Sequence, residues 1–272
     1  SQVIVPTQKV ENILKKYGVE EPDAVMPTGI ELGRFKERIS REEIDRKKKE
    51  LGIPLENKVL VSVGRLAKEK NLEELLEYFS KLIKEGAGKN FTFLIAGDGP
   101  DRENLETLAK KLQITDQVIF TGMIAPEEVG RYYKLGDVFV CASSSETQGI
   151  TYIEALACGL PALCRKDECL DQVVTDGYNG FQYENYEYFK MHLNYILEDE
   201  ERRQEMGRRG QEISQLYSTW NFCTAAERIY RETIERQERY SEIDGEKRTE
   251  GVRGRWRVFA HAWAKGIMKR GA

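Results

Sequence analysis

The 272-residue sequence predicts an α/β fold in which helices cover both faces of a parallel β-sheet. Two observations predict this class. From about residue 58 to residue 165, short β-branched runs alternate with longer segments whose apolar residues recur every three to four positions. Glycine-containing polar loops separate the runs. Regular alternation of strands and helices favours a parallel sheet, because each connection must cross back over the sheet.

The elements follow one another in a regular order. We expect strands at residues 58–63, 91–96, 118–120, 137–141 and 161–164. Helical periodicity fills the stretches between them, at residues 71–84, 101–112, 126–135 and 150–158. Sheets of this kind bind ligands at the carboxyl ends of their strands. The chemistry is therefore expected in the loops at residues 64–70, 97–101, 122–126 and 142–149.

The two ends of the chain do not fit this unit. A strand at residues 2–5 and a helix at residues 8–17 open the chain, and an extended linker follows from residue 25 to residue 30. We expect an upstream domain to be missing. The predicted boundaries are residues 1–25 for the last strand and helix of that lobe, 26–40 for a linker, 41–200 for the sheet domain, 201–243 for C-terminal helices and 244–272 for a basic tail.

Composition excludes several classes of protein. The chain is 40% apolar and 32% charged, which is typical of a globular domain. Its 42 basic and 46 acidic residues give a net charge of −4, which argues against nucleic acid as the main partner. Five cysteines without a CxxC pair, and two histidines, favour reduced, packed thiols and no metal site. Without an apolar run of 18 residues or a visible signal peptide, we expect a cytoplasmic protein.

The first chemical motif is Gly64-Arg65-x4-Lys70, directly after a predicted strand. Glycine lets the backbone approach a ligand closely. Arg65 and Lys70 place two cations at the end of the sheet, where they could neutralise a diphosphate. The alternative is a solvated basic loop before the helix that begins near Asn71.

The second motif is the polar loop that leads from residue 143 into a helix near Gly149. The free N–H groups of the first helical turn form an anion site, and Thr151 adds a hydroxyl. Glu146 and Glu154 would lie about 12 Å apart if the spacing were helical. Each carboxylate can accept hydrogen bonds from two vicinal hydroxyls. The alternatives are a helix-capping role for Glu146 and an ordinary helix acid at Glu154.

Together these motifs resemble a known family, the retaining glycosyltransferases of family 4, and within them the donor-binding half of the two-lobed GT-B fold. The resemblance also rests on the turn at residues 97–100, the strand end at residues 120–122 and the run from Ala155 to Pro161 that follows the second Glu. It extends over roughly residues 1–235 and implies a Rossmann-like sheet domain, the C-terminal half of a GT-B fold, followed by C-terminal helices.

The resemblance implies a role for each site residue. Arg65 and Lys70 would hold the diphosphate of a nucleotide sugar, and the helix N-terminus at Gly149, Ile150 and Thr151 would receive it. Glu154 would bind the ribose. Glu146 would be the catalytic residue and would bind the hydroxyls of the transferred sugar. Met123 and Ile124 would line the base pocket. Such enzymes need no metal or other cofactor, which agrees with the lack of an Asp-x-Asp motif. A partner would be the missing N-terminal, acceptor-binding lobe.

The sequence Glu146-Thr147-Gln148-Gly149 departs from the commoner Glu-x-Phe-Gly of this family. With the following Thr-Tyr-Ile-Glu helix it resembles the diacylglycerol glucosyltransferase group, which uses UDP-glucose. The tail at residues 251–272 is basic and places apolar residues, two of them Trp, on one helical arc. It would lie on an anionic membrane at the inner face, or pack on a protein domain.

Two other classes of function remain open. A non-catalytic nucleotide-binding module would keep Arg65, Lys70 and Glu154 but would not need Glu146. A membrane-surface or partner-binding protein would depend mainly on residues 251–272. If the chain carries only part of the enzyme, we expect it to bind donor but to transfer little sugar alone.

Overall fold

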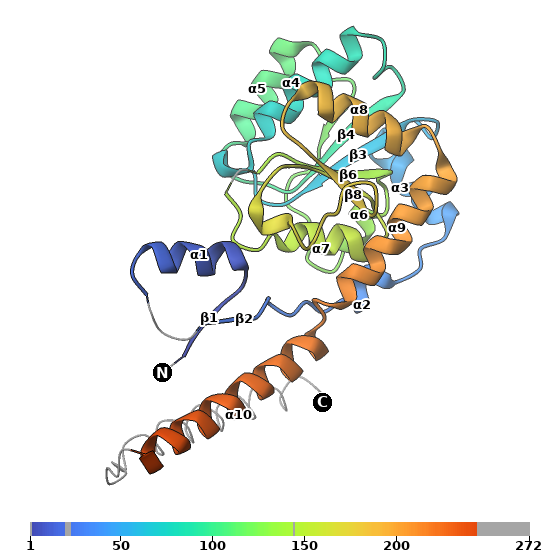
Figure 1. Cartoon of the computed structure of the whole chain (residues 1–272). Helices are drawn as coiled ribbons and strands as arrows, with labels where there is room; N and C mark the ends of the chain where they lie inside the picture. Colours follow the sequence, from blue (N-terminus) through green and yellow to red (C-terminus); the bar gives the residue numbers. More distant parts are fainter. Residues whose placement is uncertain (1, 20–22, 144, 244–272) are drawn as a thin grey trace. The chain divides into compact units, whose positions relative to one another are not determined.

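The structure is a computed structural model that describes residues 2–19, 23–143 and 145–243 (Figure 1). Within it the chain divides into two compact units, residues 2–226 and a second unit whose described part is residues 227–243. The predicted basic tail at residues 244–272 lies outside the described residues. No helix in the described part of the chain is both long and apolar enough to cross a membrane.

A six-stranded parallel sheet forms the centre of the larger unit, in the order β5-β4-β3-β6-β7-β8. This confirms the predicted parallel sheet. Its strands are β3 (Lys58–Val63), β4 (Phe91–Ala96), β5 (Val118–Phe120), β6 (Val138–Cys141), β7 (Ala162–Arg165) and β8 (Gly180–Tyr183). The edge strand β8 was not predicted, because four residues after a glycine-containing turn carry too little alternation to stand out.

Helices cover both faces of the sheet, as predicted (Figure 1). Side chains of a strand alternate between its faces, so Val59 and Val61 join one buried cluster while Leu60 joins the other. The first cluster includes residues of α2 (Gly33–Lys36), α6 (Val129–Tyr133) and α7 (Ile150–Ala157). The second includes residues of α4 (Leu72–Lys84), α5 (Arg102–Leu112) and α8 (Tyr186–Leu197).

The remaining helices are α1 (Gln8–Lys16), α3 (Arg41–Glu50), α9 (Glu200–Gln215) and α10 (Thr219–Ile243), with short 3-10 turns at η1 (Lys68–Lys70) and η2 (Glu168–Leu170). α6 is shorter than the predicted helix at 126–135. The segment before it forms hydrogen-bonded turns, in which the Glu128 N–H donates to the carbonyl of Ala125 at 2.9 Å.

The N-terminal strand has a partner that the sequence did not suggest. β1 (Val3–Val5) pairs in parallel with β2 (Asp23–Val25). The prediction placed Val25 at the start of an extended linker, whereas Val25 is the last residue of β2. The pairing of the first strand with a later one was not predicted. A three-residue strand is too short for alternation to distinguish it from a linker.

The order of the strands identifies where a ligand would bind. From β3 the chain proceeds outward through β4 to β5, and from β6 it proceeds outward on the other side through β7 to β8. The loops after β3 and β6 therefore leave adjacent strand ends in opposite directions. Such a reversal opens a crevice at the carboxyl ends of the two strands, which is the usual binding position in this class of sheet.

Candidate functional site

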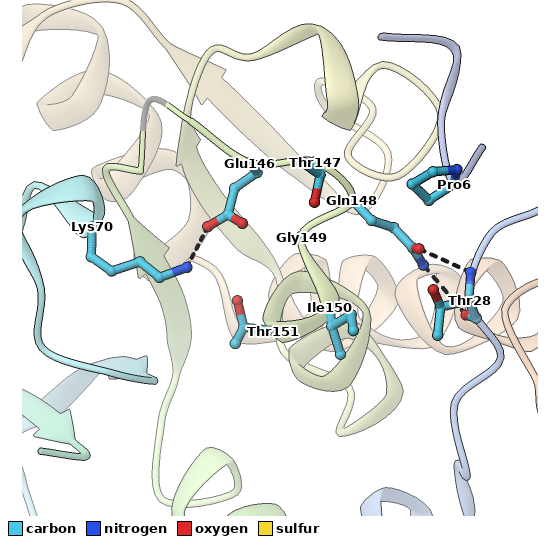
Figure 2. Close-up of a pocket in the computed structure, with 9 residues that line it drawn as sticks. All are labelled: Pro6, Thr28, Lys70, Glu146, Thr147, Gln148, Gly149, Ile150 and Thr151. Carbon is cyan, nitrogen blue, oxygen red and sulfur yellow. Dashed lines mark hydrogen bonds and ion pairs between the residues drawn. The ribbon is translucent and has the colours of Figure 1, made fainter. Parts of the chain in front are cut away.

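A cavity of about 270 Å³ lies at this reversal point. Its lining is Pro6, Thr28, Lys70, Glu146, Thr147, Gln148, Gly149, Ile150 and Thr151 (Figure 2). Lys70 follows β3 and Glu146 follows β6, and the Lys70 Nζ lies 2.6 Å from the Glu146 Oε1. The two side chains are only 25% and 13% exposed. The structure thus brings together the cation of the first motif and the first carboxylate of the second.

The backbone around β4 fixes the loop that carries Lys70. The Leu66 N–H donates to the Asp98 carbonyl at 2.9 Å, and the Asp101 N–H donates to the Leu66 carbonyl at 3.0 Å. Gly97 has a φ of +140°, and a Cβ on it would lie 2.0 Å from the Gly64 carbonyl oxygen. Only a residue without a side chain fits there. The turn at residues 97–100 therefore shapes the Lys70 loop.

Arg65 lies apart from Glu146. Its guanidinium donates to Glu69 at 2.5 Å, and its side chain is 68% exposed. It borders a smaller hollow that it shares with Lys70 and Thr151. The structure therefore places the two predicted cations in one neighbourhood, but only Lys70 reaches the larger cavity.

The helix predicted near Gly149 is present as α7, and its N-terminus faces the cavity through Ile150 and Thr151 (Figure 2). Gly149 has a φ of +71° and caps the helix without a side-chain hydrogen bond. Glu146 precedes the helix and bonds to Lys70, so the capping role considered for it is wrong. The 12 Å helical estimate also fails, because residues 146–149 are not helical.

Glu154 lies one turn into α7 and does not border the cavity. Its carboxylate accepts a hydrogen bond from the Tyr133 hydroxyl at 3.1 Å and lies 3.8 Å from the Arg34 guanidinium. With 12% of the side chain exposed, burial raises the pKa of Glu154, against the opposing effects of Tyr133 and Arg34. It is therefore not an ordinary solvated helix acid.

Sequence reasoning missed several residues at this site. Arg34 and Tyr133 reach Glu154 from α2 and α6, and no motif marks either of them. Thr28 reaches the cavity from the linker. Its N–H donates to the Gln148 Oε1 at 2.9 Å, and the Gln148 Nε2 donates back to the Thr28 carbonyl at 3.3 Å (Figure 2). The Thr-Gln departure from the common motif was the one signal that could have drawn attention to Gln148.

Met123 and Ile124 do not border the cavity. The Met123 side chain is 85% exposed, and Ile124 is partly buried against the core. Their base-binding role stays a prediction. All five cysteines are free thiols, and Cys141 and Cys164 are buried. Within the described ranges, no group of three or more His, Cys, Asp or Glu side chains is arranged to hold a metal ion.

Comparison with known proteins places these features in context. The family model described as "Glycosyl transferases group 1" matches residues 43–213. Two curated relatives carry the name alpha-monoglucosyldiacylglycerol synthase. The one from Streptococcus pneumoniae is 41% identical over 182 residues, which cover 66% of this chain and 41% of the relative. The one from Acholeplasma laidlawii is 33% identical over 234 residues, which cover 86% of this chain and 58% of the relative.

Solved structures share the fold. HepE from Anabaena, in complex with UDP and glucose, matches with a TM-score of 0.74 at 21% identity, over 86% of this chain and 63% of that one. Sucrose-phosphate synthase from Thermosynechococcus elongatus matches with a TM-score of 0.74 at 23% identity, over 86% and 58%. The chain thus spans about half the length of its curated relatives, and at these identities the structures establish the architecture alone.

Proposed function

The chain belongs to the glycosyl transferases group 1 family, and from that premise we propose that residues 2–226 form the donor-binding half of a retaining hexosyltransferase. The observation that carries the proposal is the meeting of Lys70, Glu146 and the N-terminus of α7 in one cavity at the strand reversal. A cation and a free helix N-terminus suit a diphosphate, and a carboxylate suits sugar hydroxyls.

We propose that different residues of the site bind different parts of the donor. The diphosphate lies between Lys70 and the first N–H groups of α7, with Arg65 turning from Glu69 to add a second cation. Negative charge develops on the leaving phosphate as the glycosidic bond breaks. Lys70 and the helix dipole stabilise that charge in a fixed, partly desolvated position. Glu146 accepts hydrogen bonds from the sugar hydroxyls and orients the ring for transfer with retained configuration.

Glu154 is proposed to receive the ribose. It lies on the same helix as Thr151, three residues later and therefore on the same face. The Tyr133 hydroxyl, which has a single proton to donate, lies within hydrogen-bond distance of two acceptors, the Thr151 carbonyl at 3.2 Å and the Glu154 carboxylate at 3.1 Å. Burial removes water from around this carboxylate and raises its pKa. The two hydroxyls of the ribose would donate hydrogen bonds that take the place of that water.

We further propose glucose from UDP-glucose as the transferred group and diacylglycerol as the acceptor. The support is the name shared by the two curated relatives and the Glu-Thr-Gln-Gly motif that the resemblance rests on. The basic pattern at residues 251–272 suits attachment to an anionic membrane, where such an acceptor resides.

Calorimetric titration of the 272-residue chain tests the proposal. UDP is expected to bind, with GDP and ADP binding more weakly by at least tenfold. Selective binding of GDP or ADP would keep the site but remove UDP-glucose and diacylglycerol from the proposal. Failure of all three nucleotides to bind would contradict the donor-binding assignment for this chain.

The non-catalytic module is the alternative, and Glu146→Ala separates it from the enzyme. In the proposed site this change leaves UDP affinity nearly unchanged and removes the additional affinity of UDP-glucose over UDP. Equal affinities of the parent chain for UDP and UDP-glucose, both unaffected by Glu146→Ala, would favour the module.

A further inference from the structure

The loop that carries Glu146 is anchored at three successive residues by the N-terminal segment of the chain. The Lys9 Nζ donates to the Glu146 carbonyl at 3.0 Å. The Thr7 hydroxyl donates to the Thr147 carbonyl at 2.7 Å. Gln148 forms the two hydrogen bonds with the Thr28 backbone described above. The partners are 137, 140 and 120 residues apart in the sequence, so these contacts form only when the chain folds.

Lys9 is itself held firmly. Its Nζ lies 2.7 Å from both carboxylate oxygens of Asp167, and the two side chains are 20% and 4% exposed. Asp167 also accepts a hydrogen bond at 2.8 Å from the Cys169 N–H and so caps η2, the turn after β7. Lys9 therefore connects three elements, α1, the turn after β7 and the Glu146 main chain. A charge-assisted contact of this kind is among the stronger hydrogen bonds.

We propose that Lys9 is a positioning residue for Glu146, acting with Thr7 and Thr28. The inference rests on the proposed function of the cavity. The Lys70 ammonium pairs with the Glu146 carboxylate at 2.6 Å, and a donor diphosphate would compete for the same ammonium. Once Lys70 turns to phosphate, the carboxylate loses its charged partner and depends on the main chain for its place. Lys9 fixes that main chain at Glu146 itself.

This arrangement has a consequence for the sequence motif. In Glu146-Thr147-Gln148, the two residues after the carboxylate serve as attachment points, Thr147 through its carbonyl and Gln148 through its side chain. Gln148 is buried although it is polar. A loop held in this way presents sugar hydroxyls with a carboxylate that needs little reordering, which conserves binding free energy.

The test compares UDP with UDP-glucose by calorimetry on the 272-residue chain. In Lys9→Ala, the additional affinity of UDP-glucose over UDP is expected to fall about tenfold, while UDP affinity changes less than twofold. Lys9→Arg, which keeps the charge and the donors, is expected to restore part of the loss. Lys16→Ala, an exposed lysine on the same helix, is the matched control. Equal weakening of both ligands in Lys9→Ala would show a structural role only and overturn the proposal.

A second measurement needs no ligand. The backbone ¹³C carbonyl resonance of Glu146 reports the hydrogen bond from Lys9 and is expected to shift in Lys9→Ala but not in Lys16→Ala. An unshifted resonance would overturn the proposal even if the donor assignment holds. If the parent chain binds neither ligand while the resonance shifts, the proposed function fails and the anchoring stands. Lys9→Ala/Asp167→Asn, which removes both charges, serves if the single variant is too unstable.

Discussion

The two loops that meet in the cavity are held in place by different means. The Lys70 loop is fixed by neighbouring main chain, where the turn at residues 97–100 closes on residues 64–66 through backbone hydrogen bonds. The Glu146 loop is fixed by contacts that cross 120 residues or more of sequence, with the side chains of Thr7 and Lys9 and with the backbone of Thr28. The cation is therefore held by strands next to it in the sheet, whereas the position of the carboxylate depends on residues far from it in the sequence.

This difference suggests how a donor site of this kind assembles. The diphosphate would meet a preformed cation and helix N-terminus, and the sugar would meet a carboxylate whose place is set by the segment that leads into the sheet domain. Changes in the support of the Lys70 loop should lower stability or nucleotide affinity. Changes in the support of the Glu146 loop should lower the additional affinity of UDP-glucose over UDP.

The largest expected effect comes from breaking the local support of the Lys70 loop. Gly97→Ala places a Cβ 2.0 Å from the Gly64 carbonyl oxygen at a φ of +140°. Clash and strain together are expected to cost about 3 kcal/mol or more of unfolding free energy, measured by urea denaturation. Gly86→Ala is the matched control, since its φ is +81° but nothing lies within 4 Å, and it should cost only about 1 kcal/mol. Equal costs would mean that the close approach does not constrain the loop.

The next largest effect is expected when the contact between the Lys70 loop and the Glu146 loop is removed. Lys70→Ala removes the cation that we assign to the diphosphate, and UDP affinity is expected to fall about 10- to 100-fold, the value of a charge-assisted hydrogen bond in a shielded site. Lys68→Ala, an exposed lysine two residues earlier, should change the affinity less than twofold. Titration calorimetry measures both, and unchanged affinity in Lys70→Ala would remove this residue from the nucleotide site.

The fold and the site differ in how far the sequence predicts them. The bounds of β3, β4 and β5 agree with the predicted strands, because buried parallel strands are continuous apolar runs. Lys70 and Glu146 could be placed because each follows a strand beside the reversal point. Thr28 could not, because it meets Gln148 across 120 residues, and neither could Tyr133, which meets Glu154 across 21. Such contacts depend on the folded chain and leave no spacing to recognise.

A smaller effect is expected when the contact between the Glu146 loop and Thr28 is removed. Gln148→Ala leaves the Thr28 N–H and carbonyl without this partner and should cost about 1–2 kcal/mol in urea denaturation. Because Gln148 lies in the loop that carries Glu146, the affinity for UDP-glucose should fall more than the affinity for UDP. Gln204→Ala, an exposed glutamine on α9, controls for loss of the amide. If UDP and UDP-glucose lost affinity equally, the distinction between the two loops would not hold.

The smallest effect is a pH dependence of stability that arises from Glu154, which lacks the close ammonium partner that Glu146 has. Glu146 has Lys70 at 2.6 Å, whereas Glu154 is buried with only a hydroxyl and a guanidinium at 3.8 Å, and burial raises its pKa above the usual 4.5. The folded state then retains a proton that the unfolded chain has released, so stability falls as pH rises from 4.5 through the folded pKa and levels off above it. Glu154→Gln keeps an acceptor for Tyr133 and removes this loss, so its stability relative to the parent should increase over that interval. Urea denaturation at several pH values measures it, with exposed Glu77→Gln as the control for one lost charge. A constant difference between Glu154→Gln and the parent would mean that Glu154 gains enough from Tyr133 and Arg34 to offset the effect of burial on its pKa.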